Sequence, residues 1–233
     1  MSTAKAVLIG AGLALVLVAG VAGVIALHLF PSSPKPPPPP DSVVVAMVLP
    51  GSDYVAAPRV IDLYINTASG WTVRSVSPST SVEVAGTSGS TLADAYSFGG
   101  GGGLVSALAS NPGVPVDSWV VVDESTWLRL HDSGAVSLDL PDDVEVFDGA
   151  RMYSFAKGAT TVPAAELPQL LAGTAFLSAG QDAQVRGQVG DALGKALVKN
   201  SAEASGSLHT DLPAATLLIW LREIGSARRV SGS

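Results

Sequence analysis

The hydrophobic pattern begins with an apolar run over residues 6–30, broken only by His28 near its end. A helix of this length, at about 1.5 Å rise per residue, is longer than the roughly 30 Å hydrocarbon core of a bilayer. A cleaved signal peptide is the alternative, but its apolar region has about 7–15 residues and precedes a small-residue cleavage site. This run is longer and ends in Leu-His-Leu-Phe. We therefore expect a retained transmembrane helix over residues 6–30.

Prolines follow the apolar run at positions 31, 34 and 36–40. They predict an extended polyproline II linker over residues 31–41. Lys5 lies on one side of the predicted helix and Lys35 on the other, so the positive-inside bias is slight. A head of only five residues, 1–5, and a long downstream sequence favour a cytoplasmic N-terminus. We expect a single-pass cell-membrane protein whose domain is extracytoplasmic.

Short apolar runs beyond the linker predict β-strands. The first, Val43–Leu49, is continuously apolar and rich in valine, and Pro50-Gly51 ends it. A run so short and so apolar is typical of a strand buried on both faces. Further strands are expected at Val60–Asn66, Trp71–Ser75, Trp119–Asp123, Ala135–Leu140 and Val144–Phe147.

Helical patterns lie between these strands and after them. Val185, Val189, Leu193 and Leu197 recur every four residues along one face of a predicted helix. Asp211 is a candidate N-cap and Pro213 a first-turn residue for the last helix. Helices are expected at Leu92–Ala109, Ser125–Asp132, Ala164–Ala172, Ala183–Val198 and Ala214–Ile224. Strands alternating with helices predict an α/β domain with a mixed central sheet over residues 42–226, followed by a flexible tail over residues 227–233.

Five consecutive glycines, 99–103, interrupt the helical pattern of Leu92–Ala109. A glycine loop before a helix can bind phosphate through its backbone N–H groups. No strand directly precedes this run and no lysine follows it at the required spacing. We therefore favour a tight turn between two helical segments over a phosphate loop.

Composition excludes several classes of function. The net charge of −7 and the absence of a basic stripe argue against nucleic-acid binding. The absence of cysteine excludes disulfides, thiolate metal sites and a cysteine nucleophile. His28, His131 and His209 lack the spacing of metal ligands. Arg222, Arg228 and Arg229 form a small basic cluster close to the end of the chain, where they are expected to favour the negative end of the last helix.

Several segments, read in order, resemble the LytR-CpsA-Psr (LCP) family of cell-envelope proteins. Residues 92–100 (LADAYSFGG) resemble the family segment N-x-A-Y-x-x-G-G, and residues 113–123 (GVPVDSWVVVD) resemble G-x-x-I-D-x-Y-V-x-V-D. Residues 130–141 (LHDSGAVSLDLP) are similar to L-V-D-x-L-G-G-V-x-V-x-V-P. The resemblance covers most of residues 43–225. It implies an extracytoplasmic α/β domain that acts on glycopolymers carried by polyprenyl pyrophosphate.

The resemblance also implies site residues, and the chain departs from most of them. Family arginines come from I-P-R-D-T, Y-x-R-x-R and R-x-x-R-Q motifs, whereas residues 76–80 (VSPST) and 170–174 (LLAGT) contain no arginine. Arg186 and Gln188 remain from the third motif, and Arg59 and Arg74 are further candidate ligand-binding residues. Asp53 and Asp62 match the magnesium-binding carboxylates of the family, which implies Mg²⁺ as a cofactor.

The missing arginines decide which function we favour. Each charge-assisted contact to a phosphate contributes on the order of 1.5–3 kcal/mol. Their loss favours a catalytically silent envelope protein that binds a wall glycopolymer, a lipid-linked precursor or a partner protein. The alternative is a residual glycopolymer phosphotransferase or pyrophosphatase that acts on polyprenyl-pyrophosphate-linked substrates. No catalytic residue is assigned.

Overall fold

The computed structural model describes residues 37–50, 55–110, 115–131 and 134–230. The predicted transmembrane helix over residues 6–30 and the candidate ligand Asp53 lie outside this part of the chain. Within the described ranges, no helix is both long enough and apolar enough to cross a membrane. The prediction of a membrane anchor therefore stays a prediction.

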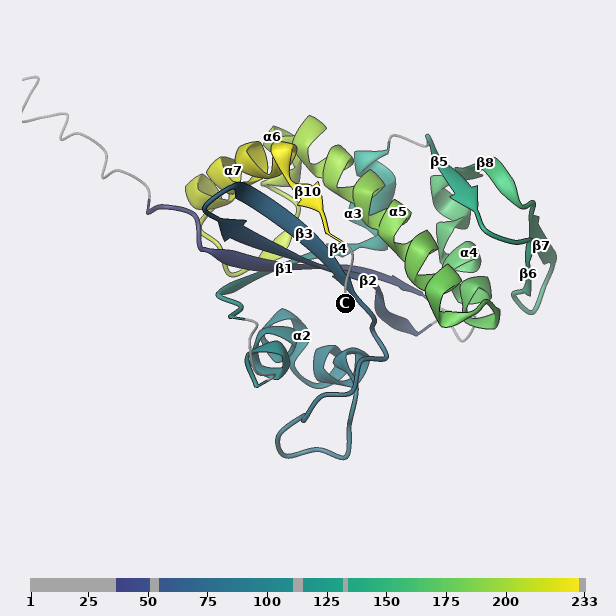
Figure 1. Cartoon of the computed structure of the whole chain (residues 1–233), viewed down its shortest axis with the longest axis horizontal. Helices are drawn as coiled ribbons and strands as arrows, with labels where there is room; N and C mark the ends of the chain where they lie inside the picture. Colours follow the sequence, from purple (N-terminus) through teal and green to yellow (C-terminus); the bar gives the residue numbers. More distant parts are fainter. Residues whose placement is uncertain (1–36, 51–54, 111–114, 132–133, 231–233) are drawn as a thin grey trace, which may run out of the picture. The chain divides into compact units, whose positions relative to one another are not determined.

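A six-stranded mixed sheet forms the centre of the domain, in the order β10-β3-β2-β1-β4-β9 (Figure 1). β1 pairs antiparallel with β2 and parallel with β4. Seven of the nine positions of β1 are apolar and buried, which confirms the prediction of a strand covered on both faces. The strands are β1 (Ser42–Pro50), β2 (Ala56–Thr67), β3 (Gly70–Val76), β4 (Ser118–Asp123), β9 (His209–Thr210) and β10 (Arg228–Arg229).

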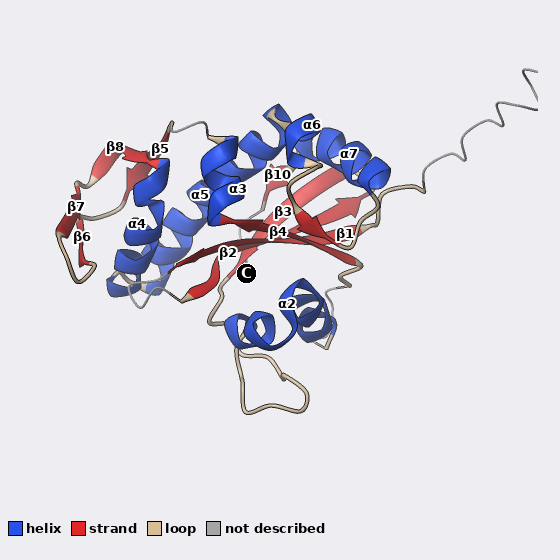
Figure 2. Ribbon diagram, turned by 180° about the vertical axis from the view of Figure 1, so that it is seen from behind, coloured by secondary structure: helices blue, strands red, loops and turns tan. Residues whose placement is uncertain are grey.

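Helices cover both faces of this sheet (Figure 2). One face packs on α2, where Val44, Ala46 and Leu104 share a core. The other face packs on the remaining helices, with Val45, Met47 and Trp220 in the larger core. Complete burial of a side chain of this size contributes about 1.5–3 kcal/mol, so the two cores fix the sheet in place. The helices are α2 (Leu92–Ala109), α3 (Glu124–Leu130), α4 (Leu167–Gly173), α5 (Ala179–Lys199), α6 (Ser201–Ala204) and α7 (Ala214–Glu223).

The glycine run lies inside α2 and bends it. Gly100 has φ 57° and ψ −145°, so the helical backbone is interrupted at this residue. A positive φ is readily adopted only by glycine. A tight loop over all five glycines was expected, but the interruption is confined to Gly100 and the other four glycines are helical.

Two small antiparallel ribbons extend beyond the central sheet. β5 (Ala135–Leu140) pairs with β8 (Gly158–Pro163), and β6 (Val144–Phe147) pairs with β7 (Met152–Phe155). The 3-10 helix η1 (Ala164–Glu166) leads from β8 into α4. The sequence pattern predicted β5 and β6 with these bounds but not their partners β7 and β8.

The C-terminal part of the domain corrects two expectations. Asp211 does not cap α7, because no side chain caps the first turn of this helix. Instead, the carboxylate of Asp211 accepts a hydrogen bond from the backbone N–H of Trp119 at 3.0 Å. Residues 227–233 were expected to be a flexible tail. After the 3-10 helix η3 (Ile224–Ser226), however, Arg228–Arg229 pair with β3, and the N–H of Val230 donates to Val73 at 2.9 Å. The edge of β3 is therefore covered by the end of the chain.

Candidate functional site

A pocket of about 500 Å³ lies where the start of β2, the loop after β3 and the starts of α2 and α5 meet. Arg59 and Arg186, two of the four predicted ligand-binding residues, both line it. We call this cavity the Arg59–Arg186 pocket. The sequence places these arginines 127 residues apart, and the fold brings them together.

The guanidinium of Arg186 is held by a network of acceptors on the wall of this pocket. Its Nε donates to both carboxylate oxygens of Asp182, at 2.8 and 2.9 Å. Its Nη1 donates to the backbone oxygen of Arg59, and its Nη2 lies 3.3 Å from Oγ1 of Thr174. The hydroxyl of Thr174 also donates to Asp182 at 2.6 Å. Arg186 is only 14% exposed, so its charge is largely balanced within the protein.

Arg59, whose backbone oxygen binds Arg186, also contacts backbone carbonyl groups with its own guanidinium. Its Nε donates to the oxygen of Leu49 at 3.4 Å, and its Nη2 to that of Val55 at 3.5 Å. Two arginines and Asp182 give the pocket a net charge of one positive unit. A single net positive charge is weak compensation for a pyrophosphate, which carries at least two negative charges.

The remaining polar groups of the pocket are mainly hydroxyls. Ser77 and Ser79, from the loop after β3, lie with their Oγ atoms 2.8 Å apart, and Thr91 and Thr174 contribute two more hydroxyls. These groups both donate and accept hydrogen bonds. The pocket is therefore better suited to the hydroxyls of a sugar, or to one phosphate, than to a dense anionic group.

The partial positive charge at the N-terminus of α2 is neutralised by Asp94, a residue of its first turn. Asp94 Oδ2 accepts hydrogen bonds from the N–H groups of Ser90 and Thr91 at 2.9 and 3.0 Å, and Thr91 caps the helix in return. The hydrogen bond from the Ser90 backbone, followed by that from the Thr91 side chain, lowers the pKa of Asp94. This carboxylate already occupies the positive end of the helix, where an anion would otherwise bind.

The structure separates the other two predicted ligand-binding residues from this pocket. The side-chain amide of Gln188 forms hydrogen bonds of 2.7 and 2.8 Å with the backbone of Asp139 and thereby joins α5 to β5. Arg74 follows the buried residue Val73 on β3, so its side chain projects from the opposite, α2 side of the sheet. Its backbone pairs with Leu63 of β2, and its guanidinium forms no hydrogen bond or ion pair with the described residues.

Asp62 is buried under α5, where Arg229 binds it. The Nη1 and Nη2 atoms of Arg229 lie 3.1 and 2.9 Å from Oδ1 and Oδ2 of Asp62, and Ser75 donates to Oδ1 at 2.7 Å. Asp191 accepts from Nε of Arg229 at 2.7 Å. Burial opposes the charge on Arg229, but the hydrogen bonds with Asp62 and Asp191 outweigh it and raise the pKa of this guanidinium.

This arrangement does not fit a magnesium ligand at Asp62. Mg²⁺ requires oxygen ligands at about 2.0–2.1 Å in an octahedron. Here both oxygens of Asp62 accept hydrogen bonds from a guanidinium that already balances the carboxylate charge. No group of three or more histidine, cysteine, aspartate or glutamate residues suited to a metal ion was found within the described ranges. The second predicted ligand, Asp53, lies outside them.

Sequence reasoning missed three of the groups that define these sites. Asp182 was detectable, because an aspartate four residues before Arg186 is the spacing of a helical ion pair. Thr174 gave no signal, since its position depends on the turn between α4 and α5. This turn contains the 3-10 helix η2 (Thr174–Phe176). Arg229 was assigned to the tail, and nothing local indicates its pairing with Asp62.

Comparison with solved structures identifies the fold. An LCP (LytR-Csp2A-Psr) enzyme from Actinomyces oris is similar with a TM-score of 0.63 and 15% identity, over 85% of this chain and 83% of that chain. TagV from B. subtilis is similar with a TM-score of 0.53 and 17% identity, over 83% and 85% of the two chains. TagT bound to LI-WTA is similar with a TM-score of 0.54 and 17% identity, over 82% and 78%. No family model matches the chain, and no curated protein matches its sequence. The chain therefore has the LCP fold, as the order of its motifs predicted.

Proposed function

We propose that this chain is a membrane-anchored, extracytoplasmic member of the LCP group that binds a wall glycopolymer or its lipid-linked precursor without transferring it. The LCP fold and the apolar run over residues 6–30 support this placement. TagT, which has the same fold, forms a complex with LI-WTA. A polymer or precursor of related chemistry is therefore the class of ligand that we expect for this chain.

The state of Arg186 is the observation that carries the proposal of catalytic silence. A transferase of this class must stabilise a departing phosphate with positive charge that is available at the transition state. In this chain, Asp182, Thr174 and the backbone of Arg59 already occupy the guanidinium of Arg186. Releasing it would leave Asp182 without its partner. Loss of one partner of a partly buried ion pair is costly, so Arg186 is poorly placed to follow a developing charge.

Binding in the pocket is expected to depend on Arg59. The full chain in a non-ionic detergent is titrated with a polyprenyl-pyrophosphate-linked oligosaccharide in a calorimeter, with and without Mg²⁺. Product formation is followed in parallel by chromatography. We expect binding without turnover and without dependence on Mg²⁺, and roughly tenfold weaker binding by the Arg59→Gln variant. Arg151→Gln is the matched control, because Arg151 lies on the exposed ribbon outside the pocket.

The alternative is residual phosphotransferase or pyrophosphatase activity, favoured by the presence of Arg59 and Arg186 in one pocket. Time-dependent release of phosphate or pyrophosphate that is lost in both Arg59→Gln and Asp53→Ala would support this activity and overturn catalytic silence. Tight binding that requires Mg²⁺ would also count against the proposal. No binding of the precursor to the wild-type chain would remove the proposed role of the pocket.

A further inference from the structure

A second cavity, of about 890 Å³, opens between the end of α3, the start of β5 and the C-terminal half of α5. It shares no lining residue with the Arg59–Arg186 pocket. Three cations line it, Arg129, Lys195 and Lys199, together with a single carboxylate, Glu203. We call this cavity the α3–α5 groove. Its net charge of two positive units contrasts with the net charge of −7 of the whole chain.

The two lysines of this groove lie on one face of α5 without acidic partners. Lys195 and Lys199 are four residues apart, and like charges at this spacing destabilise a helix by a few tenths of a kcal/mol. Neither ammonium group has an ion pair or hydrogen bond with another described residue. Arg129, in contrast, pairs with Glu203 at 3.8 Å. The groove therefore presents two lysine ammonium groups that form no ion pair with a described residue.

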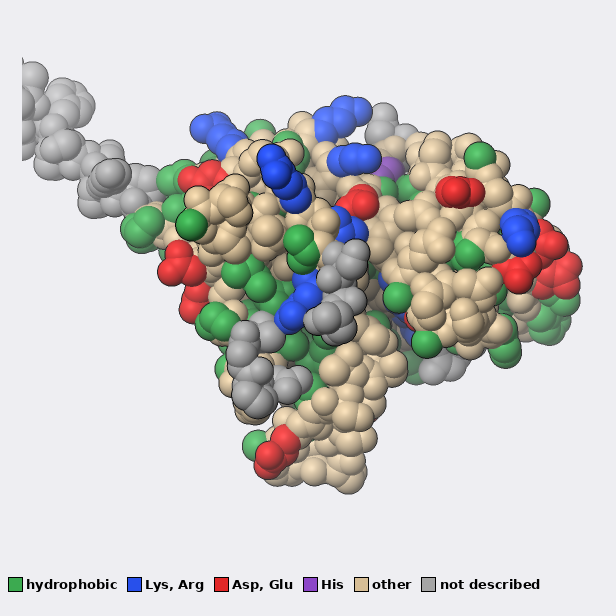
Figure 3. Space-filling model, viewed as in Figure 1, with side chains coloured by type: hydrophobic (Ala, Val, Ile, Leu, Met, Phe, Trp, Pro, Cys, Tyr) green, Lys and Arg blue, Asp and Glu red, His purple; other side chains and the backbone are tan. Residues whose placement is uncertain are grey.

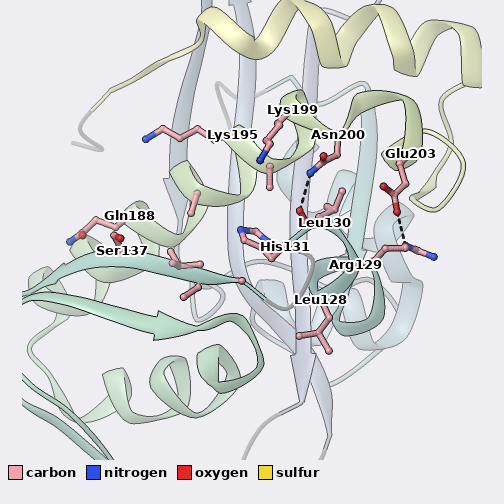
Figure 4. Close-up of a pocket in the computed structure, with 15 residues that line it drawn as sticks. Leu128, Arg129, Leu130, His131, Ser137, Gln188, Lys195, Lys199, Asn200 and Glu203 are labelled. Carbon is pink, nitrogen blue, oxygen red and sulfur yellow. Dashed lines mark hydrogen bonds and ion pairs between the residues drawn. The ribbon is translucent and has the colours of Figure 1, made fainter.

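The remaining walls give the groove a fixed shape. The ring of His131 packs against that of Trp127, with 3.7 Å between the ring centroids, and Asn200 donates to the backbone oxygen of Leu130 at 2.9 Å. In Figure 4, Lys199 reaches from α5 toward His131, whereas Lys195 extends from the same helix on the side of Gln188. The two ammonium groups thus diverge, so they can contact two anionic groups of one extended ligand.

The distribution of charge on the surface also favours binding of an anionic ligand near α5. Figure 3 shows acidic side chains gathered at the end of the molecule that carries β6 and β7. Lysine and arginine side chains lie over α5 and α7, with a few acidic side chains among and below them. A local excess of positive charge raises the concentration of an anionic ligand near it. An anionic chain is therefore attracted to the α5 side and repelled from the ribbon.

We propose that the α3–α5 groove binds successive phosphate groups of a phosphodiester-linked polymer. Lysine binds phosphate as a compact point charge on a flexible side chain. This suits the repeating phosphates of a polymer better than the planar guanidinium of arginine, which favours one fixed geometry. The groove is open, so a polymer can enter and leave it along its length. This binding site is separate from the Arg59–Arg186 pocket and does not depend on the function proposed for that pocket.

The test uses an oligomer of glycerol phosphate and the full chain in a non-ionic detergent at low salt. The Lys195→Gln/Lys199→Gln variant is expected to bind the oligomer at least roughly tenfold more weakly than the wild type. The matched control is Arg151→Gln/Lys157→Gln, which removes the same number of charges from the exposed ribbon and should bind as the wild type does. Arg59→Gln should also leave this binding unchanged. A negative result for ligand binding in the Arg59–Arg186 pocket can therefore be distinguished from a negative result for polymer binding in the α3–α5 groove.

Two further measurements keep the proposal falsifiable. Without ligand, the Lys195→Gln/Lys199→Gln variant should have a Tm within a few degrees of that of the wild type, because the loss of Lys199 from the last turn of α5 offsets the relieved repulsion. A much lower Tm would indicate a structural role for the lysines and count against the proposal. A neutral dextran oligomer or a hyaluronate oligomer that binds as tightly as the glycerol phosphate oligomer would overturn it, as would unchanged binding by the double variant.

Discussion

Asp62 and Arg229 are 167 residues apart in the sequence and form a bidentate ion pair under α5. Asp62 is 1% exposed and Arg229 is 23% exposed, so the pair is largely removed from water. This contact links the edge strand β10 to β2, which lies on the far side of β3. It also gives Asp62, which the sequence suggested as a magnesium ligand, a partner within the protein.

Removal of Arg229 should destabilise the domain strongly. Arg229→Gln leaves a buried carboxylate without its cation, and breaking such a pair costs about 3–5 kcal/mol. Urea denaturation followed by tryptophan fluorescence measures the loss. Arg228→Gln, at the exposed neighbouring position, is the control and should change the free energy of unfolding by less than about 0.5 kcal/mol.

The double variant Asp62→Asn/Arg229→Gln tests the pairing itself. It should recover much of the stability that Arg229→Gln loses, because no buried charge is then left without a partner. Equal losses in the single and double variants would contradict a direct interaction between the two side chains.

The close approach of α5 to this ion pair requires glycine at position 190. A Cβ atom there would lie 2.1 Å from Oδ2 of Asp62 and 2.8 Å from Nη2 of Arg229. Gly190→Ala should therefore destabilise the domain by about 1–3 kcal/mol through overpacking. Gly180→Ala on the same helix has no atom within 4 Å of the new Cβ and should stabilise the domain, by up to about 1 kcal/mol. Equal effects of the two substitutions on the urea midpoint would refute this explanation.

The glycine run in α2 makes a similar prediction. A Cβ atom at Gly101 would lie 2.1 Å from the ring of Trp119, whereas one at Gly102 would meet nothing within 4 Å. Gly101→Ala should lower the free energy of unfolding by about 1–3 kcal/mol, and Gly102→Ala should leave it unchanged or raise it. If both variants bind ligands as the wild type does, the run serves packing. Loss of ligand binding in the stable Gly102→Ala variant would favour the phosphate-loop interpretation instead.

The cap of α2 predicts a pH dependence. The pKa of Asp94 is lowered in the folded state, first by the backbone of Ser90 and then by the hydroxyl of Thr91. The stability that it contributes is therefore present above its unfolded pKa of about 3.9 and is lost as the pH falls through the lower folded pKa. Asp94→Asn should lower the Tm at pH 6 by roughly a few degrees.

The difference between the wild type and Asp94→Asn should shrink toward pH 3. Glu83→Gln, an exposed loop residue, is the control and should follow the wild-type Tm over the same range. A difference in Tm that stays constant from pH 6 to pH 3 would show that the carboxylate charge of Asp94 does not contribute.

The sequence predicted those elements whose hydrophobic pattern or glycine content is visible within a few neighbouring residues. The buried valines of β1, the four-residue repeat of α5 and the interruption at Gly100 could all be read from neighbouring residues. β7 and β8 could not, because their exposure alternates but the hydrophobicity of their short sequences, Met-Tyr-Ser-Phe and Gly-Ala-Thr-Thr-Val-Pro, does not. Asp211 was misread for another reason: a tertiary contact with the backbone of Trp119 uses the carboxylate that local preference assigned to a helix cap.

The candidate sites were predictable only in part. Arg59 and Arg186 were selected from the sequence and meet in one pocket. Gln188, two residues from Arg186, faces another part of the domain because successive residues of a helix point about 100° apart. The pairing of Asp62 with Arg229 depends on the whole fold and has no local signal.

The position of β10 has a consequence for the folding of the nascent chain during translation. Asp62 is translated 167 residues before its partner Arg229. Until Arg229 leaves the ribosome, the half-built sheet contains an unpaired acidic group and an uncovered edge at β3. Closure of the sheet at β3 therefore has to wait for Arg229, and a nascent chain stalled before this residue should remain sensitive to proteases.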